Sequence, residues 1–463
     1  MHPTSMTDDQ RTRRAVQARG ATERLSTHDI VGVAVTWVDN SGLTRVKTVP
    51  PARLEHAAVW GIGASPVFDA FLLDDSIMSG RHAGSPVGDL RLHPDLDKTV
   101  VLAAQPGWAW APADRYTQDG DVHPQCARSF LQRMTDGLRA DGFTALTALE
   151  VEWTVGREGG DDFVPACTGP AYGMTRVIEL SDYARDLLSA LAIQGVQVDQ
   201  FHPEYGAGQL ELSVAAQDPV SAADTNVLVR QTIRAVGMRH QLRTSFSPKV
   251  LPDGVGNGGH VHLSLSEDGT NQMGGGDRPG GLRATGASFV AGILARLPGL
   301  LAIGAPSAAS YLRLVPSHWA GAFGCWGVEN RETAIRLIPG SAGSREWSAN
   351  VEVKCVDTAA NPYLLIGALL AAGRAGMAEG TALPDPIEVD PAGMSDQERS
   401  ARGVVELPGD LESAAAALEA DPVLTEALGL ELSATIADLR RAEAVLTAQL
   451  SPAAITDLAR WKY

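Results

Sequence analysis

The chain has 463 residues, of which 44% are hydrophobic and 20% charged, and this balance excludes a wholly disordered protein. Its 38 Lys and Arg residues against 55 Asp and Glu residues give a net charge of −17, which argues against a nucleic-acid partner. The longest apolar stretch, residues 362–373, is too short to cross a bilayer, so no membrane partner is expected. Because the N-terminus has no apolar leader, we expect a cytoplasmic protein.

The order of polar and apolar segments predicts a short extension followed by two domains. Residues 1–25 are polar and charged, and we expect this N-terminal extension to be frayed. A turn-rich stretch near residue 118 separates a strand-rich part, residues 26–118, from a larger part, residues 119–463. In the larger part strand and helix patterns are mixed, which predicts an α+β fold rather than a doubly wound sheet.

The local patterns predict individual elements along the chain. Val- and Thr-rich segments around Asn40-Ser41-Gly42 predict a β-hairpin, and a further strand is expected from Lys98. In the larger part, helical periodicity predicts helices and alternation predicts strands. The expected helices cover residues 126–138, 181–195, 219–242, 287–301 and 362–377 and most of the last 45 residues. The expected strands cover residues 144–155, two segments within 196–214, and 243–250, 259–266, 312–316, 333–339 and 349–357.

Four of the expected strand segments carry polar pairs whose members are two positions apart. The pairs are Glu150 and Glu152, Gln209 and Glu211, His260 and His262, and Glu352 and Lys354. Residues two apart share one face of a strand, while the apolar residue between them faces a core. For any one pair a solvated strand face is the simpler interpretation. If these faces meet, however, they bring acids (with Glu204) and histidines together, and a divalent cation such as Mg²⁺ or Mn²⁺ relieves the repulsion.

Arginines accompany these acids in the last third of the chain. Arg313, Arg331 and Arg336 present planar forks that match carboxylate and phosphate, although each could also pair with a nearby surface acid. Acids for a cation beside arginines for phosphate are the parts of a phosphoryl-transfer site. The sequence has neither a P-loop nor a protein-kinase signature. The glycine-rich run at residues 255–260 is compatible with either a tight turn or a close backbone approach to a ligand.

Five segments, in this order, resemble those of the glutamine synthetase family. They are LEVEW (149–153), HPEYGAGQLE (202–211), GNGGHVHLSL (256–265), ENRETAIR (329–336) and VEVKCVDTAANPYL (351–364). The resemblance covers nearly the whole chain. It implies a small β-grasp-like N-terminal domain and a large catalytic domain with a curved antiparallel sheet and surrounding helices. It also implies a ring of subunits, commonly a dodecamer, with active sites between neighbours.

The resemblance implies a role for each matching residue, with two or more Mg²⁺ or Mn²⁺ ions in each site. The metal that positions glutamate would be held by Glu152, Glu204 and Glu211. The metal that bridges the nucleotide phosphates would be held by Glu150, His260 and Glu352. L-glutamate would contact Gly256 and Arg313, and ATP would contact Asp199, His262, Ser264 and Arg336. The transferred phosphate would be surrounded by Arg331, Arg336 and Lys354, the last at a position where the family usually has arginine.

The sequence departs from the family at the expected amine site. In glutamine synthetases the arginine that matches Arg313 is followed six residues later by a flap glutamate that binds and deprotonates ammonium. Here that position is Trp319, which cannot take a proton but offers an apolar wall and a cation–π face to an alkylammonium group. The alternative is that Trp319 only packs the flap. The family's aspartate from the N-terminal domain is matched ambiguously, by Asp74 or Asp75, and these two acids could equally form a solvated loop.

Two stretches that overlap these segments, EYGAGQLELS and SHWAGAFGCWGVENRE, are most similar to actinobacterial members of the family that act on polyamines. The resemblance therefore implies ligation of the γ-carboxylate of L-glutamate to putrescine, cadaverine, spermidine or spermine. The reaction would use ATP, pass through γ-glutamyl phosphate and release ADP and phosphate. Ethanolamine, a monoamine or ammonium remain alternative amines. A non-catalytic role is a further alternative, which the complete set of metal-binding residues disfavours.

Overall fold

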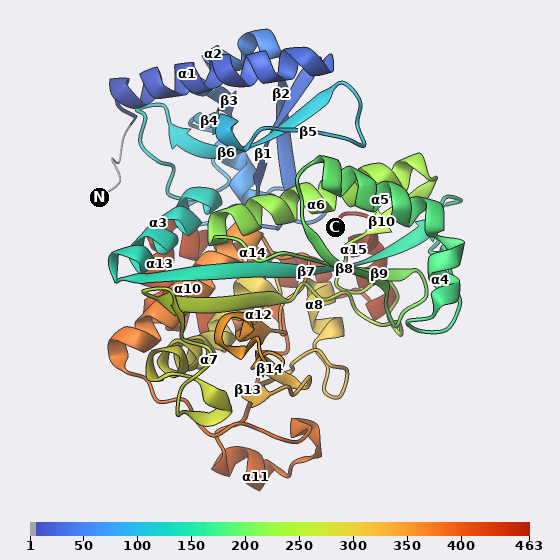
Figure 1. The fold of residues 1–463 in the computed structure, drawn as a ribbon, viewed down its shortest axis with the longest axis vertical. Helices are drawn as coiled ribbons and strands as arrows, with labels where there is room; N and C mark the ends of the chain where they lie inside the picture. Colours follow the sequence, from blue (N-terminus) through green and yellow to red (C-terminus); the bar gives the residue numbers. More distant parts are fainter. Residues whose placement is uncertain (1–5, 161) are drawn as a thin grey trace.

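Two β-sheets with their covering helices form the protein in a computed structural model that describes residues 6–160 and 162–463 (Figure 1). The small sheet has the order β2-β1-β6-β4-β3, with β5 beside β6. Its strands are β1 (Gly32–Val38), β2 (Thr44–Val49), β3 (Ile62–Ala64), β4 (Leu90–Pro94), β5 (Val100–Val101) and β6 (Trp108–Thr117). The hairpin expected around Asn40-Ser41-Gly42 is confirmed, since β1 and β2 pair antiparallel across that turn.

The large sheet runs in the order β16-β13-β14-β15-β11-β7-β9-β8, with β10 paired to β7 and β12 to β11. Apart from the parallel pair β13–β14, its strands are antiparallel, and the α+β prediction is confirmed. Its strands are β7 (Phe143–Arg157), β8 (Val198–Pro203), β9 (Gln209–Val214), β10 (Leu242–Ser245), β11 (Val261–Glu267), β12 (Thr270–Asn271), β13 (Phe323–Val328), β14 (Thr333–Ile338), β15 (Asn350–Val353) and β16 (Val405–Glu406).

The helices lie against both sheets, with a large continuous apolar core at the large sheet and a separate, smaller core at the small sheet. They are α1 (Asp8–Leu25), α2 (Leu54–Trp60), α3 (Ala127–Ala140), α4 (Met174–Glu179), α5 (Ser181–Ile193), α6 (Pro219–Arg239), α7 (Ala284–Gly304), α8 (Ala308–Arg313), α9 (Arg345–Ser348), α10 (Pro362–Glu379), α11 (Asp396–Ala401), α12 (Leu411–Ala420), α13 (Pro422–Leu428), α14 (Leu430–Thr447) and α15 (Pro452–Arg460). Helices α7 and α10 touch through glycines, since a Cβ on Gly292 would lie 2.3 Å from the Ala372 carbonyl oxygen. Helix α7 is long and apolar enough to cross a membrane, but 72% of its most apolar window is buried, as in a core helix.

Three local predictions are wrong. Residues 8–25, expected to be frayed, form helix α1, because Thr7 and Gln10 make a capping box and the helix buries Ala18 and Ala21 against the small sheet. The strand expected at residues 312–316 is not formed, because Ser307 caps the short helix α8, which ends at Arg313. A three-residue alternation does not distinguish a strand from a helix end. The strand expected from Lys98 is reduced to the two residues of β5.

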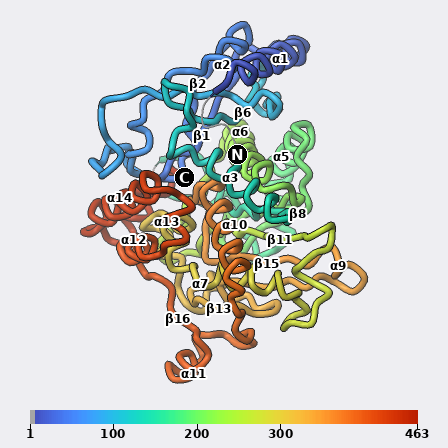
Figure 2. The backbone as a smooth tube through the Cα atoms, turned by 90° about the vertical axis from the view of Figure 1, so that its left-hand side faces the viewer, coloured from blue at the N-terminus to red at the C-terminus, as the bar shows by residue number. Residues whose placement is uncertain are grey.

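The hairpin turn between β1 and β2 is buried against the large domain (Figure 2). Asn361, Arg440 and Tyr463 donate hydrogen bonds to backbone carbonyls of residues 38–41, with donor–acceptor distances from 2.6 to 3.2 Å. Gly42 has φ of +81°, and a Cβ at this position would lie 1.8 Å from a carbonyl oxygen of the segment that precedes α10. Only glycine therefore fits this turn, which fixes the small sheet on the large domain.

A buried charge network lies where β6 leaves the small sheet. The Asp69 carboxylate accepts hydrogen bonds from Arg115 at 2.5 Å and from His123 at 2.8 Å. Arg115 also donates to the backbone carbonyl of Gln125. Burial alone would raise the pKa of Asp69, but the charge of Arg115 and the hydrogen bond from His123 outweigh it and lower this pKa. Asp69 and Arg115 therefore form a buried ion pair in the folded protein.

We predict that Asp69→Asn lowers the free energy of unfolding by about 3 kcal/mol, because it leaves the buried Arg115 charge without its partner. Since the folded pKa of Asp69 is depressed, its stabilisation is present above the unfolded value of about 3.9 and is lost as pH falls through the folded value. Urea unfolding at fixed protein concentration should show the full difference at pH 7 and a smaller one in acid.

The matched control is Asp9→Asn, which removes an exposed carboxylate paired with Arg13 on α1 and should change stability by less than about 0.5 kcal/mol. Equal effects of the two substitutions would contradict the proposed stabilising role of the Asp69 network.

Candidate active site

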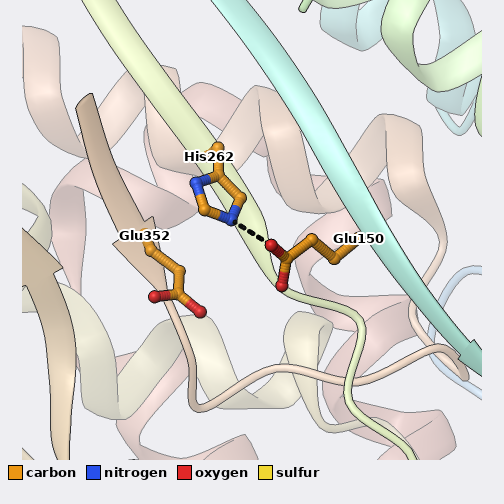
Figure 3. A group of neighbouring side chains, drawn as sticks. All are labelled: Glu150, His262 and Glu352. Carbon is orange, nitrogen blue, oxygen red and sulfur yellow. Dashed lines mark ion pairs between the residues drawn. The ribbon is translucent and has the colours of Figure 1, made fainter. Parts of the chain in front are cut away.

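The strand register brings the first group of predicted ligands together on one face of the large sheet. His262 on β11 lies opposite Glu352 on β15, and Glu150 on β7 donates its backbone N–H to the His260 carbonyl. His262 Nε2 lies 3.1 Å from Glu150 Oε1, and one ligand atom each from Glu150, His262 and Glu352 lie within 4.8 Å of one another (Figure 3). His260 Nδ1 lies 3.1 Å from Glu150 and 3.2 Å from Glu352. Both histidines, not only His260, therefore adjoin the two acids.

Cationic neighbours keep the acids of this first group ionised. Burial would raise the pKa of Glu150, but hydrogen bonds from His260 and His262 outweigh it and lower this pKa. Burial likewise opposes ionisation of Glu352, yet the charges of His260 and Lys354 bring its pKa down to about 2. The pKa of His262 is raised to about 9, because its interaction with Glu150 outweighs burial.

A second group forms between β7, β9 and β8. Glu152 lies opposite Glu211, which in turn lies opposite His202. Ligand atoms of His202, Glu204 and Glu211 lie within 4.8 Å of one another, with His202 Nε2 3.3 Å from Glu211. Glu152 accepts hydrogen bonds from the Gly258 backbone N–H at 2.8 Å and from a side-chain amide on β9 at 3.0 Å. The three acids predicted for this site, Glu152, Glu204 and Glu211, are thus neighbours, and His202 lies among them.

The second group is poorer in cations than the first. Burial raises the pKa of Glu152 to about 7, against the charge of Arg313. Burial also raises the pKa of Glu211 to about 7, against a hydrogen bond from His202, whose own pKa that bond raises to about 9. Carboxylates are the hard oxygen ligands that Mg²⁺ and Mn²⁺ prefer, and an imidazole is compatible with Mn²⁺, so a divalent cation here would relieve the repulsion between the acids. Both groups therefore fit the metals that the resemblance implies.

Three residues of this second group were not identified from the sequence. His202 lies in the HPEYGAGQLE segment two positions before Glu204, and the same two-residue spacing used for the other pairs could have found it. Tyr172 donates from its hydroxyl to Glu204 Oε2 at 2.8 Å. Arg176 is buried and donates to the backbone carbonyls of Glu204 and Gly206, which fixes the loop. Tyr172 and Arg176 lie far along the chain from Glu204, and no motif or spacing in the sequence pointed to them.

Arg313 ends helix α8 inside the site. One of its terminal nitrogens, Nη2, donates to the Lys354 carbonyl at 3.1 Å and lies 3.3 Å from His260 Nε2. The other, Nη1, is buried and has no hydrogen-bond partner among the described residues. A Cβ on Gly256 would lie 2.5 Å from Arg313 Cγ, so this position needs glycine. A buried guanidinium nitrogen without an acceptor is suited to bind a carboxylate ligand.

The other basic residues divide between the site and the surface. Arg336 and Lys354 each donate to the Glu352 carboxylate at 3.1 Å, and Lys354 is buried. Arg331 is exposed, with its guanidinium carbon 5.8 Å from the centre of the Trp319 ring. Two of the predicted nucleotide contacts, His262 and Ser264, lie on the same face of β11. A third, Asp199, is exposed near the start of β8.

The predicted amine-site residues do not all meet within one chain. Trp319 lies on the flap, the segment of residues 315–322, and is 58% exposed. In the described residues Asp74 accepts hydrogen bonds from Ser76, and Asp75 pairs with Arg45 and with Lys462. Within residues 6–160 and 162–463, neither aspartate forms a hydrogen bond or ion pair with the strands that carry the acids. Their predicted role in the site of a neighbouring subunit stays a prediction.

Comparisons with known proteins agree with this geometry. Residues 124–455 match the family "Glutamine synthetase, catalytic domain". The chain is 54% identical over 450 residues to the gamma-glutamylpolyamine synthetase GlnA3 of Streptomyces coelicolor, covering 96% of this chain and 97% of that protein. The crystal structure of a novel glutamine synthase homolog superposes with a TM-score of 0.84 at 33% identity, covering 94% of this chain and 99% of the other. A GmaS/ADP complex superposes with a TM-score of 0.82 at 27% identity, covering 93% and 97%. The chain belongs to the glutamine synthetase family.

Replacement of Glu211 by Gln tests the second group through two effects of opposite sign. The substitution removes one of several repelling carboxylates, so the metal-free protein should keep or raise its thermal midpoint. Magnesium-dependent ADP formation should fall by roughly a hundredfold or more, because loss of even an indirect metal contact costs 10–100-fold. The rise in thermal midpoint on adding Mg²⁺ should also shrink.

Glu267→Gln serves as the control, since this glutamate is exposed at the far end of β11. Undiminished ADP formation and an undiminished Mg²⁺-induced shift in the Glu211 variant would refute the assignment of this group as a metal site.

Proposed function

We propose that this protein joins the γ-carboxylate of L-glutamate to an amino group of a polyamine, consuming ATP and releasing ADP and phosphate. The observation that carries the proposal is that the flap after Arg313 presents the exposed Trp319 in place of an acid, in a chain that keeps both acid–histidine groups. An indole cannot serve as the acid that ammonium requires, but its face and edge suit an alkyl chain with a terminal charge. The high identity to a gamma-glutamylpolyamine synthetase supports the same conclusion.

In the proposed reaction the chain's own residues bind and orient. Arg313 holds the α-carboxylate of glutamate with its unpartnered Nη1, which aims the γ-carboxylate at the γ-phosphorus of ATP. Arg336 and Lys354, joined by Arg331, neutralise charge on the transferred phosphoryl oxygens. The γ-carboxylate oxygen forms the new P–O bond and ADP leaves, giving γ-glutamyl phosphate. A neutral amine then attacks the acyl carbon, the acyl C–O bond to the phosphate breaks, and the proton lost by the amine leaves with the phosphate, giving the amide.

We propose two cation sites for this reaction, one at each acid group. Mg²⁺ or Mn²⁺ would be held by Glu150, Glu352 and the two histidines of β11 in one, and by Glu152, Glu204, Glu211 and His202 in the other. When bound, such cations supply charge neutralisation for phosphoryl transfer. His262 and Ser264 would contact the nucleotide. Asp199 would contact ATP from β8.

We also propose that the chain works as a ring, with a dodecamer as the expected assembly. Family membership supports this proposal, and so do the local partners of Asp74 and Asp75, which among the described residues are Ser76, Arg45 and Lys462 and include no residue of the flap. We expect the enzyme to be cytoplasmic and to have neither a nucleic-acid nor a membrane partner.

Arg313→Lys should raise the KM for glutamate by about 10- to 100-fold with little change in the KM for ATP, because one ammonium nitrogen cannot replace both the Nη2 donor to the Lys354 carbonyl and the free Nη1 donor. Initial rates of ADP release at varied glutamate measure this. Arg139→Lys, on the exposed face of α3, is the control. An unchanged KM for glutamate would remove Arg313 from the proposed glutamate site.

The test of the proposed function is phosphate release from ATP and glutamate with Mg²⁺ across a panel of amines, with products identified by mass. The panel contains putrescine, cadaverine, spermidine, spermine, ethanolamine, a monoamine and ammonium. We expect γ-glutamyl products with the polyamines and little glutamine. Turnover chiefly with ammonium would mean that Trp319 only packs the flap, and preference for ethanolamine or the monoamine would refute polyamine specificity.

A further inference from the structure

The flap that carries Trp319 is bonded to an acid from another part of the chain. The backbone N–H of Trp319 donates to Glu332 Oε1 at 3.0 Å. Glu332 lies in the loop between β13 and β14, thirteen residues further along the chain. A carboxylate therefore stands beside the flap tip, although the flap itself has none at position 319.

This loop holds Glu332 in a defined place. Asn330 accepts a hydrogen bond from the Glu332 backbone N–H at 3.0 Å. The Asn330 side-chain amide also donates to the carbonyls of Ile387 and Val389, at 2.8 and 3.0 Å. The flap is held as well, because Ser317 donates to Asp390 at 2.8 Å. Glu332 is thus fixed by its backbone, and it contacts the flap through one side-chain oxygen.

Glu332 is half-buried, and among the described residues its carboxylate is bonded to the Trp319 N–H and forms no ion pair. Burial raises the pKa of Glu332, and its hydrogen bond from Trp319 and the more distant charges of His318 and Lys354 do not offset this rise, so the carboxylate would gain from a positive partner in direct contact. The exposed Trp319 ring beside it already has a guanidinium, that of Arg331, 5.8 Å from its centre. A carboxylate next to a cation-accepting aromatic face is the chemistry that recognises an alkylammonium group.

We propose that Glu332 is a specificity-determining residue that binds an ammonium group of the polyamine. It supplies from a fixed loop the negative charge that the flap tip lacks, while Trp319 contacts the alkyl chain. This inference rests on the proposed function, because it assigns the recognition of the same amine substrate to a particular side chain.

Glu332→Gln separates charge from flap contact, because the amide oxygen can still accept the Trp319 N–H. The KM for putrescine should rise about tenfold or more, as expected when a charge-assisted hydrogen bond is lost. The KM values for ATP and glutamate should stay within about twofold. Formation of γ-glutamyl hydroxamate from hydroxylamine, which is uncharged at neutral pH, should be unchanged, because this nucleophile needs no anionic partner.

Glu388→Gln removes the same charge from an exposed position in the segment that contacts Asn330, and it should leave all these values unchanged. An unchanged KM for putrescine in Glu332→Gln would overturn the inference, and so would an equal loss with hydroxylamine, which would show that Glu332 only positions the flap. If the wild-type protein ligated no polyamine, the proposed function would fail together with this inference. Polyamine ligation by the wild type with no effect of Glu332→Gln would refute the inference alone.

Discussion

Repulsion between carboxylates on neighbouring strands is the constraint on which the site depends. The register puts Glu152 directly opposite Glu211 across the β7–β9 pair, where like charges destabilise a sheet. On the other side β11 separates Glu150 from Glu352, and His262 of β11 lies opposite Glu352. The metal-free chain meets this constraint differently on its two sides. Lys354 and the β11 histidines keep one side ionised, whereas on the other side burial raises the pKa of Glu152 and Glu211 to about 7. A bound metal would therefore relieve more repulsion at Glu152 and Glu211, the side with fewer cations.

The same strands that carry the charged face also carry the core. Val151, Leu210, Val261 and Val353 alternate with the acids and histidines and are buried. A slip of one residue would turn every polar pair into the core, at a prohibitive cost for buried charge, so the apolar face fixes the register that the site needs. The stability of the sheet and the geometry of the site are therefore consequences of one alternating pattern.

This alternation explains how much could be predicted from the sequence. Pairs of polar residues two positions apart, such as Glu150 and Glu152, can be read directly from the sequence. Once the strands are assumed to be antiparallel neighbours, these pairs are expected to lie together, so both acid groups could be predicted. Tyr172 and Glu332 were not, because each reaches the site through a loop whose path depends on the rest of the fold. The end of α8 was misassigned for a related reason, since the helix is set by the Ser307 cap and by burial of Arg313 rather than by its apolar pattern.

Backbone strain in the flap links these distant contacts to specificity. Ser317 and Trp319 both have positive φ, 59° and 56°, a conformation that costs a non-glycine residue free energy and persists only where surrounding contacts enforce it. The enforcing contacts here end on two acids outside the flap, Asp390 and Glu332. Glu332 lies outside the flap, on a loop that Asn330 anchors through its bonds to the carbonyls of Ile387 and Val389. Because this charge lies outside the flap, the flap tip can present an indole, which suits an amine that brings an alkyl chain with its charge.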